Sequence, residues 1–310
     1  MAVFFDIQDL PDFKNAVITI GTFDGVHEGH KAILHEVVSH AEHAGGESLL
    51  LTFEPHPRKL LFSDQPLGII TPLHQKLQLI TETGINHIVV VPFTREFAGM
   101  SAQEYIEHFL VDIFHPHSII IGYDHRFGHD RKGDLKLLEK CAQEGGYELI
   151  EIPPQLIEDA AVSSTKIRHA IQEGRMEDAH QMLGRNYSFS GIVKHGNKLG
   201  RTLGYPTANL VPTEPEQIIP ARGIYAIQAA YNGALHNGMM SIGYNPTVTD
   251  TKDIKIEANL FDFDEEIYGA TLEIFLVKRL RDEQKFDSLE ALIRQLDEDK
   301  KVTRQLFAGS

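Results

Sequence analysis

Gly21–His30 has the sequence GTFDGVHEGH and joins a predicted strand to a predicted helix. The apolar run Ala16–Ile20 precedes it, and in Lys31–His43 after it apolar residues recur at helical spacing. Glycine lets the backbone approach a ligand closely, and a helix N-terminus presents N–H groups to phosphate. His27 and His30 stand three residues apart, so both imidazoles can donate to the oxygens of one anion there. The alternative interpretation is a glycine-rich turn that carries two exposed histidines.

Apolar runs and helical patterns alternate through the first half of the chain. The expected strands are Ala16–Ile20, Ser48–Phe53, His87–Val91, Ser118–Ile121 and Tyr147–Ile152. The expected helices are Lys31–His43, Pro72–Thr83, Ala102–Val111 and Leu135–Glu144. Apolar strands that alternate with amphipathic helices predict a parallel sheet covered on both faces. Ligands bind beyond the carboxyl ends of the strands in such sheets, where the motifs of this chain also lie.

A second motif, Thr52–Arg58 (TFEPHPR), follows the second predicted strand. Its two prolines fix a rigid turn and hold His56 between them. Without other support, a proline-rich loop with a surface histidine is the simpler interpretation.

A third motif, Ile121–Gly133 (IGYDHRFGHDRKG), places cations between glycines after the fourth predicted strand. The charged residues are Asp124, Arg126, Arg131 and Lys132. Cations near one strand end suit phosphates, and Phe127 can cover a flat ring. A solvated, charged loop is the alternative.

A fourth motif, Val162–Arg168 (VSSTKIR), leads into a helix. A hydroxyl from Ser163, Ser164 or Thr165 can cap that helix, and capping alone is a sufficient structural explanation for any single serine. Lys166 and Arg168 add cations beside a helix start that favours anions.

The pattern changes after a predicted helix Lys166–Leu183, which is broken at Gly174 and stopped by Gly184. We place the domain boundary near Arg185, giving domains of residues 1–185 and 186–310. The expected strands beyond it are Ser188–Val193, Ala208–Val211, Gly223–Tyr231, Gly238–Ile242, Lys255–Leu260 and Ala270–Lys278. Turn signals between them predict an antiparallel barrel or sandwich, which a helix at Ser288–Leu306 closes.

Gly191–Leu210 (GIVKHGNKLGRTLGYPTANL) is the densest stretch of this second half. Gly196, Gly200 and Gly204 allow its loop to wrap close to phosphates, with charge from Lys198 and Arg201. A flexible hairpin is the alternative. At its end, Thr207 and Asn209 alternate on a strand, so their oxygens face the same side. Two hard neutral oxygens together with nucleotide phosphates suit Mg²⁺, whereas the alternative is a threonine and an asparagine that finish a turn.

Composition limits the class of protein. The 310 residues are enough for two domains, and 42% apolar with 24% charged residues is typical of a globular chain. A net charge of −15 argues against general affinity for nucleic acid or anionic membranes. The lone Cys141 excludes an intramolecular disulfide, and no apolar run has the length of a membrane span. Met1–Leu10 lacks a signal-peptide pattern, so we expect a cytoplasmic protein.

The first half of the chain resembles the adenylyl- and cytidylyltransferase superfamily through the His-x-Gly-His pattern of His27–His30. The whole phrase is similar to that of the bacterial FAD synthetases, which are fused to riboflavin kinase. The resemblance implies a Rossmann-like α/β domain. It implies ATP or phosphate contacts from Gly21, Phe23, Gly25, Gly29, Ser164 and Thr165, and flavin contacts from His56, Asp124, Arg126 and Phe127. It also implies catalytic roles for His27, His30 and Arg168. Tyr123 and His125 depart from the family pattern of the third motif.

The second half resembles riboflavin kinase from Gly191 to Asp299. This resemblance implies that Thr207 and Asn209 ligate magnesium and that Glu257 takes the proton from the ribityl hydroxyl. It also implies that the glycine-rich loop binds ATP, through Gly196, Lys198, Gly200 and Arg201. Asn259 stands where the family often has histidine.

Together the two resemblances imply a bifunctional enzyme with riboflavin, FMN, FAD and ATP as its ligands and Mg²⁺ at both sites. The first step phosphorylates riboflavin to FMN, and the second adenylylates FMN to FAD with release of pyrophosphate. A kinase with an inactive first domain and a non-enzymatic flavin-binding regulator stay open as alternatives. A nucleotidyltransferase for another phosphate substrate is a third. The oligomeric state is not predicted.

Overall fold

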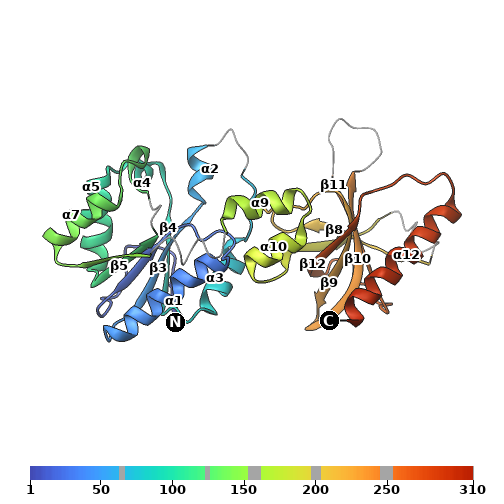
Figure 1. Cartoon of the computed structure of the whole chain (residues 1–310), viewed down its shortest axis with the longest axis horizontal. Helices are drawn as coiled ribbons and strands as arrows, with labels where there is room; N and C mark the ends of the chain where they lie inside the picture. Colours follow the sequence, from blue (N-terminus) through green and yellow to red (C-terminus); the bar gives the residue numbers. More distant parts are fainter. Residues whose placement is uncertain (63–66, 123–125, 153–161, 197–203, 245–253, 310) are drawn as a thin grey trace. The chain divides into compact units, whose positions relative to one another are not determined.

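The computed structural model describes residues 1–62, 67–122, 126–152, 162–196, 204–244 and 254–309. The chain forms two compact units, Met1–Ser164 and Thr165–Ser310 (Figure 1). In this division α9 (Ser164–Gln172) and α10 (Met176–Leu183) lie almost entirely with the second unit. The break predicted at Gly174 and the stop predicted at Gly184 are confirmed, and both glycines have positive φ.

The first unit is built on a sheet of six parallel strands. In sheet order they are β1 (Ala2–Phe4), β4 (His87–Pro92), β3 (Ser48–Glu54), β2 (Val17–Ile20), β5 (Ser118–Gly122) and β6 (Glu148–Ile152). The five predicted strands are confirmed. Strand β1 was missed because three half-buried residues are too few to show a pattern. Strand order reverses at β2, so the turn Gly21–His30 leaves the sheet where such folds bind ligands.

Helices cover both faces of this sheet, as predicted. They are α1 (Glu28–His43), α2 (Pro57–Leu61), α3 (Leu73–Thr81), α4 (Arg95–Gly99), α5 (Ala102–Glu104), η1 (Tyr105–Val111), α6 (Asp112–Phe114), η2 (His129–Arg131) and α7 (Leu135–Gly145). Successive strand residues point to opposite faces. Leu49 and Leu51 thus share a core with Phe109 of η1, whereas Leu50 shares the other core with Leu34 of α1.

One predicted helix has a different geometry. The α-helix expected at Ala102–Val111 is a short α5 that continues as the π-helix η1. Tyr105 and Phe109 of η1 are both buried. The spacing of apolar residues predicts that a helix has a buried face, but it does not distinguish α from π hydrogen bonding over so short a segment.

The second unit contains a closed antiparallel barrel, which decides between the barrel and the sandwich predicted from sequence. In barrel order its strands are β10 (Ala234–Tyr244), β11 (Ile254–Leu260), β8 (Ala208–Pro212), β7 (Tyr187–Lys194), β12 (Thr271–Arg281) and β9 (Gly223–Tyr231). A two-residue turn, Asn232–Gly233 with both φ positive, joins β9 to β10 and matches the twist of the hairpin. Strand β10 therefore begins four residues earlier than predicted.

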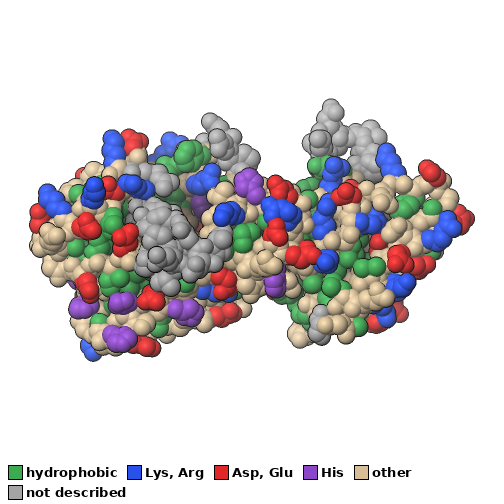
Figure 2. Space-filling model, viewed as in Figure 1, with side chains coloured by type: hydrophobic (Ala, Val, Ile, Leu, Met, Phe, Trp, Pro, Cys, Tyr) green, Lys and Arg blue, Asp and Glu red, His purple; other side chains and the backbone are tan. Residues whose placement is uncertain are grey.

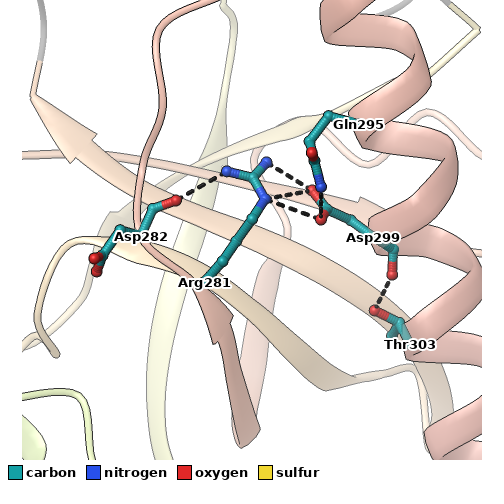
Figure 3. Close-up of polar contacts among 5 residues, drawn as sticks. All are labelled: Arg281, Asp282, Gln295, Asp299 and Thr303. Carbon is teal, nitrogen blue, oxygen red and sulfur yellow. Dashed lines mark hydrogen bonds and ion pairs between the residues drawn. The ribbon is translucent and has the colours of Figure 1, made fainter.

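The predicted closing helix is α12 (Leu289–Ala308), and it packs on the outside of the barrel. The Asp299 carboxylate on α12 is 4% exposed and forms a bidentate ion pair with Arg281 at the end of β12 (Figure 3). Arg281 Nη2 lies 2.7 Å from Asp299 Oδ2, and Arg281 Nε lies 2.9 Å from Asp299 Oδ1. Gln295 Nε2 also donates to this carboxylate at 2.9 Å, so the buried charge is well hydrogen bonded.

Acidic and basic side chains are interspersed over both units on the face drawn in Figure 2. Within the described ranges, the chain contains no helix with the length and apolar character needed to cross a membrane.

The ion pair between Arg281 and Asp299 gives a test of how α12 is held. Removing one partner of a buried pair leaves an uncompensated charge, so Asp299→Ala should lower the free energy of opening of α12 by about 3 kcal/mol. Hydrogen exchange of the α12 amides measures this opening. The matched control is Glu298→Ala, because Glu298 pairs with Lys301 at 3.7 Å on the exposed side of the same helix. Equal protection of α12 in both variants would contradict the prediction.

Candidate active sites

The turn Gly21–His30 is fixed by buried polar contacts. The Asp24 carboxylate is 2% exposed and accepts hydrogen bonds from the backbone N–H groups of Ile70 (3.0 Å) and Thr71 (3.1 Å). Val26 has a φ of 39°, which is rare for a β-branched residue and persists only where surrounding contacts impose it. The turn is therefore a rigid platform at the carboxyl end of β2.

The two histidines of the turn form one stacked unit. Their ring centroids lie 3.5 Å apart with an interplanar angle of 15°, and the Phe23 ring lies 4.7 Å from that of His30. His27 caps α1, since its Nδ1 accepts the His30 backbone N–H at 3.2 Å. His27 is only 5% exposed, so the alternative of two exposed histidines is wrong.

His30 is held in its neutral form. Burial lowers its pKa well below 6.5, and the nearby His27 and Lys76 lower that pKa further. Its buried Nδ1 has no hydrogen-bond partner in the described part of the chain. A neutral imidazole here can donate to a phosphate oxygen as charge develops on it.

Lys76 on α3 brings a cation to this platform, and the sequence analysis missed it. Its ammonium donates to the Thr22 carbonyl (3.2 Å) and to the Thr52 hydroxyl (3.0 Å), at the ends of β2 and β3. Lys76 is 5% exposed, and burial lowers its pKa, while Glu54 and Asp24 oppose the shift. In the sequence its only signal is its place four residues before the buried Ile80 on one helix face.

The glycines of the turn serve close packing. A Cβ atom on Gly21 would lie 2.9 Å from the Phe23 ring, and Gly25 has a φ of 95°. Gly29 is buried in the first turn of α1. These positions keep the backbone compact beside the histidines, which is the condition for the predicted approach of phosphate.

The residues predicted to contact flavin lie in different environments. His56 is 8% exposed and caps α2, where its Nδ1 accepts the backbone N–H of Arg58 at 3.2 Å. Phe127 belongs to the core and stacks on Tyr105 with 5.0 Å between ring centroids. Arg126 is half exposed and lies 3.5 Å from the Asp134 carboxylate. The predicted Asp124 lies outside the described residues, as do the departures Tyr123 and His125.

The fourth motif begins at the platform. Ser164, the first residue of α9, donates from its hydroxyl to the Asp24 carbonyl at 2.8 Å. Thr165 is exposed, and Arg168 is 8% exposed on the same helix.

In the barrel, strand pairing brings two predicted site residues together. Glu257 on β11 lies directly opposite Asn209 on β8. Opposed residues of antiparallel strands point to the same face, with their Cβ atoms about 5 Å apart. Ile256 and Ala258 are buried in the barrel, so Glu257 and Asn209 lie on its outer face. Lys255 forms an ion pair with Glu257 at 2.8 Å, and both side chains are partly exposed.

The surroundings of Asn209 fit the predicted magnesium ligands. Gly196 packs directly on the amide, because a Cβ atom there would lie 2.1 Å from Asn209 Nδ2. Asn209 lies opposite Glu257, and Thr207, which precedes β8, is partly buried like Asn209. Within the described residues, no group of three or more His, Cys, Asp or Glu side chains is placed to hold a metal. This donor set suits Mg²⁺ that also binds nucleotide phosphates.

Three predicted residues of the glycine-rich loop fall outside the described part of the chain: Lys198, Gly200 and Arg201.

Two family models match separate parts of the chain. The FAD synthetase model matches residues 9–166, and the riboflavin kinase model matches residues 183–307.

Curated relatives match almost the full length. The bifunctional riboflavin kinase/FMN adenylyltransferase of Listeria monocytogenes is 39% identical over 295 residues, covering 95% of this chain and 93% of that protein. The Bacillus subtilis protein of the same name is 37% identical over 298 residues, covering 95% and 93%. Among solved structures, a Streptococcus pneumoniae protein described as a macrolide-efflux protein has a TM-score of 0.88 and 31% identity. That match covers 97% of this chain and 98% of the other. The chain belongs to the family of bifunctional riboflavin kinase/FMN adenylyltransferases.

Proposed function

We propose that this chain makes FAD from riboflavin in two successive steps, one in each half. The riboflavin kinase half (residues 186–310) transfers the γ-phosphoryl group of ATP to the 5′-hydroxyl of riboflavin, giving FMN and ADP. The adenylyltransferase half (residues 1–185) joins AMP from a second ATP to FMN, giving FAD and pyrophosphate. The separate family matches to the two halves support this assignment.

The pairing of Glu257 with Asn209 is the observation that carries the kinase proposal. The Glu257 carboxylate takes the proton of the ribityl hydroxyl as its oxygen bonds to the γ-phosphorus and the bond to ADP breaks. Lys255, which is paired with this carboxylate, keeps it close to the strand. Thr207 and Asn209 would hold Mg²⁺, which neutralises phosphate charge when bound.

The stacked histidines carry the adenylyltransferase proposal. A phosphate oxygen of FMN attacks the α-phosphorus of ATP, and pyrophosphate leaves. His27 and His30 hydrogen bond to the phosphate oxygens. The family resemblance assigns to Arg168 the neutralisation of charge on the leaving group. The step needs positioning and charge neutralisation without a covalent enzyme intermediate.

A chromatographic time course with riboflavin, ATP and Mg²⁺ tests both steps. We expect FMN to rise first and then to give way to FAD. A course that stops at FMN would favour a kinase whose first domain is inactive, and no reaction from either flavin would favour a binding protein.

Glu257→Gln separates the two activities. It removes the proton acceptor but keeps the shape of the side chain, so FMN formation should fall by about 10²–10⁴-fold. Conversion of supplied FMN to FAD should stay at the wild-type rate, which serves as the internal control for folding. The proposal fails if the variant still phosphorylates riboflavin at a rate near that of the wild type.

The buried His30 predicts how stability depends on pH. Its pKa is lowered in the folded chain, so between that pKa and about 6.5 only the unfolded chain binds the proton, and stability falls as pH drops. From pH 7.5 to 5.5 the wild type should lose up to about 1.4 kcal/mol more than His30→Gln. Hydrogen exchange of α1 at the two pH values measures this difference.

His43→Gln is the matched control for this prediction, because His43 lies exposed at the other end of α1. It should keep the pH dependence of the wild type. If His30→Gln keeps it too, then His30 is not held neutral by burial.

A further inference from the structure

The segment that carries Thr207 has little backbone support from the barrel. Strand β8 begins at Ala208, and its pairing with β11 ends where Ala208 lies opposite Ala258. One step further in this register, Thr207 would lie opposite Asn259. Pro206 has no N–H group to donate, so a backbone ladder cannot continue through it. Other contacts must therefore fix the direction of the Thr207 side chain.

Asn259 supplies one such contact. Its Nδ2 donates to the Pro206 carbonyl at 2.6 Å, and its side chain is 6% exposed. On its other side β11 pairs with β10, which places Met239 opposite Asn259. The side-chain amide of Asn259 thus links β11 to the segment before β8, beyond the last backbone pair of Ala258 with Ala208.

Tyr205 supplies the second contact, and it leads to the C-terminal helix. The ring is 7% exposed and packs with Met239, Phe261 and Leu296 of α12. The Tyr205 hydroxyl donates to the Asp297 carboxylate on α12.

The part of α12 that carries Asp297 is itself fixed to the barrel. Asp297 lies two residues before Asp299, which the ion pair with Arg281 ties to β12. The Nζ atom of Lys300, on the next turn of α12, lies 5.6 Å from the centre of the Tyr205 ring. The position of α12 on the barrel therefore sets the position of Tyr205, and Tyr205 is adjacent to Pro206 and Thr207.

We propose that Asn259, Tyr205 and Asp297 are positioning residues of the kinase, which aim the Thr207 oxygen and make the metal site depend on the docking of α12. This inference rests on the proposed kinase function. Residues that orient metal ligands typically change metal affinity by about 10–100-fold when they are removed. The effect belongs to metal–nucleotide binding, because none of the three residues is a proposed ligand or base.

The proposal also accounts for the asparagine at position 259. The Nδ2 atom of asparagine and the Nδ1 atom of histidine are each bonded to Cγ, so both nitrogens lie two bonds from Cβ. Histidine can therefore present a donor to the same carbonyl, and Asn259→His should keep the function. Asn259→Leu has a similar size but no donor.

The first measurement is binding of Mn²⁺ in the presence of ADP to the full-length chain. Paramagnetic broadening of the ¹³C-methyl signal of Met239 reports occupancy next to Asn259, and assignment uses Met239→Leu. We expect Asn259→Leu to weaken the Mn²⁺ response by about 10-fold or more. Asn259→His should restore it to within about threefold of the wild type. Conversion of FMN to FAD should not change in either variant.

The link to α12 is tested by a double-mutant cycle. Tyr205→Phe and Asp297→Ala each remove the same hydrogen bond, so each should weaken the Mn²⁺ response by a similar factor, and the double variant should be no worse than one single variant. Glu298→Ala is the control at the neighbouring helix position and should match the wild type.

Several outcomes would overturn the inference. Wild-type Mn²⁺ binding in Asn259→Leu, failure of Asn259→His to restore binding, or additive losses in the cycle would each do so. If Asn259→Leu does not fold, the cycle decides alone. If the wild-type chain shows neither Mn²⁺ broadening of Met239 nor FMN formation, the kinase proposal itself is refuted. If the wild type is active and the variants match it, only the positioning role is refuted.

Discussion

Buried backbone N–H and C=O groups just outside the strands need hydrogen-bond partners that the sheet does not supply. In both candidate sites, side chains supply these partners. In the α/β unit, Lys76 donates to the Thr22 carbonyl, and Asp24 accepts from two loop N–H groups. In the barrel, Asn259 donates to the Pro206 carbonyl. Each contact fixes a segment immediately beyond a strand end. The segments that carry the predicted chemistry are therefore rigid although they are not part of a sheet.

The sequence predicted the features that depend on local pattern. Buried strands are apolar runs, and the helices between them have a clear apolar face, so strands, helices and motifs could be located along the chain from residues alone. Features that depend on register could not. Lys76 is buried through contacts with strand ends far from it in sequence, and a lysine on an amphipathic helix is usually exposed. The sequence also did not show that Phe127, which is predicted to cover a flat ring, packs in the core.

The two halves use different electrostatics for related chemistry. A phosphate of FMN is already a nucleophile, so the proposed adenylyltransferase site needs donors for the charge that develops on phosphate oxygens. We propose the stacked His27 and His30 as these donors, and burial lowers the pKa of His30 well below its usual value. A hydroxyl must lose a proton to attack, so the kinase site needs an acceptor. Glu257 is the acceptor that we propose, and its strand partner Asn209 is uncharged.

The net charge of −15 makes these local arrangements necessary. A polyanionic nucleotide is repelled by such a chain at long range, although salt screens exposed charges beyond about 8 Å. Attraction of the nucleotide must then come from charges within the site, where water and ions screen electrostatic interactions only weakly. An exposed lysine would contribute weakly against this background. Lys76 is 5% exposed and lies at the strand ends beside the histidines, so its charge acts through a medium of low polarity. Burial lowers the pKa of Lys76, so this ammonium loses its proton more readily than an exposed lysine does. The same burial reduces the screening of its charge while it is protonated.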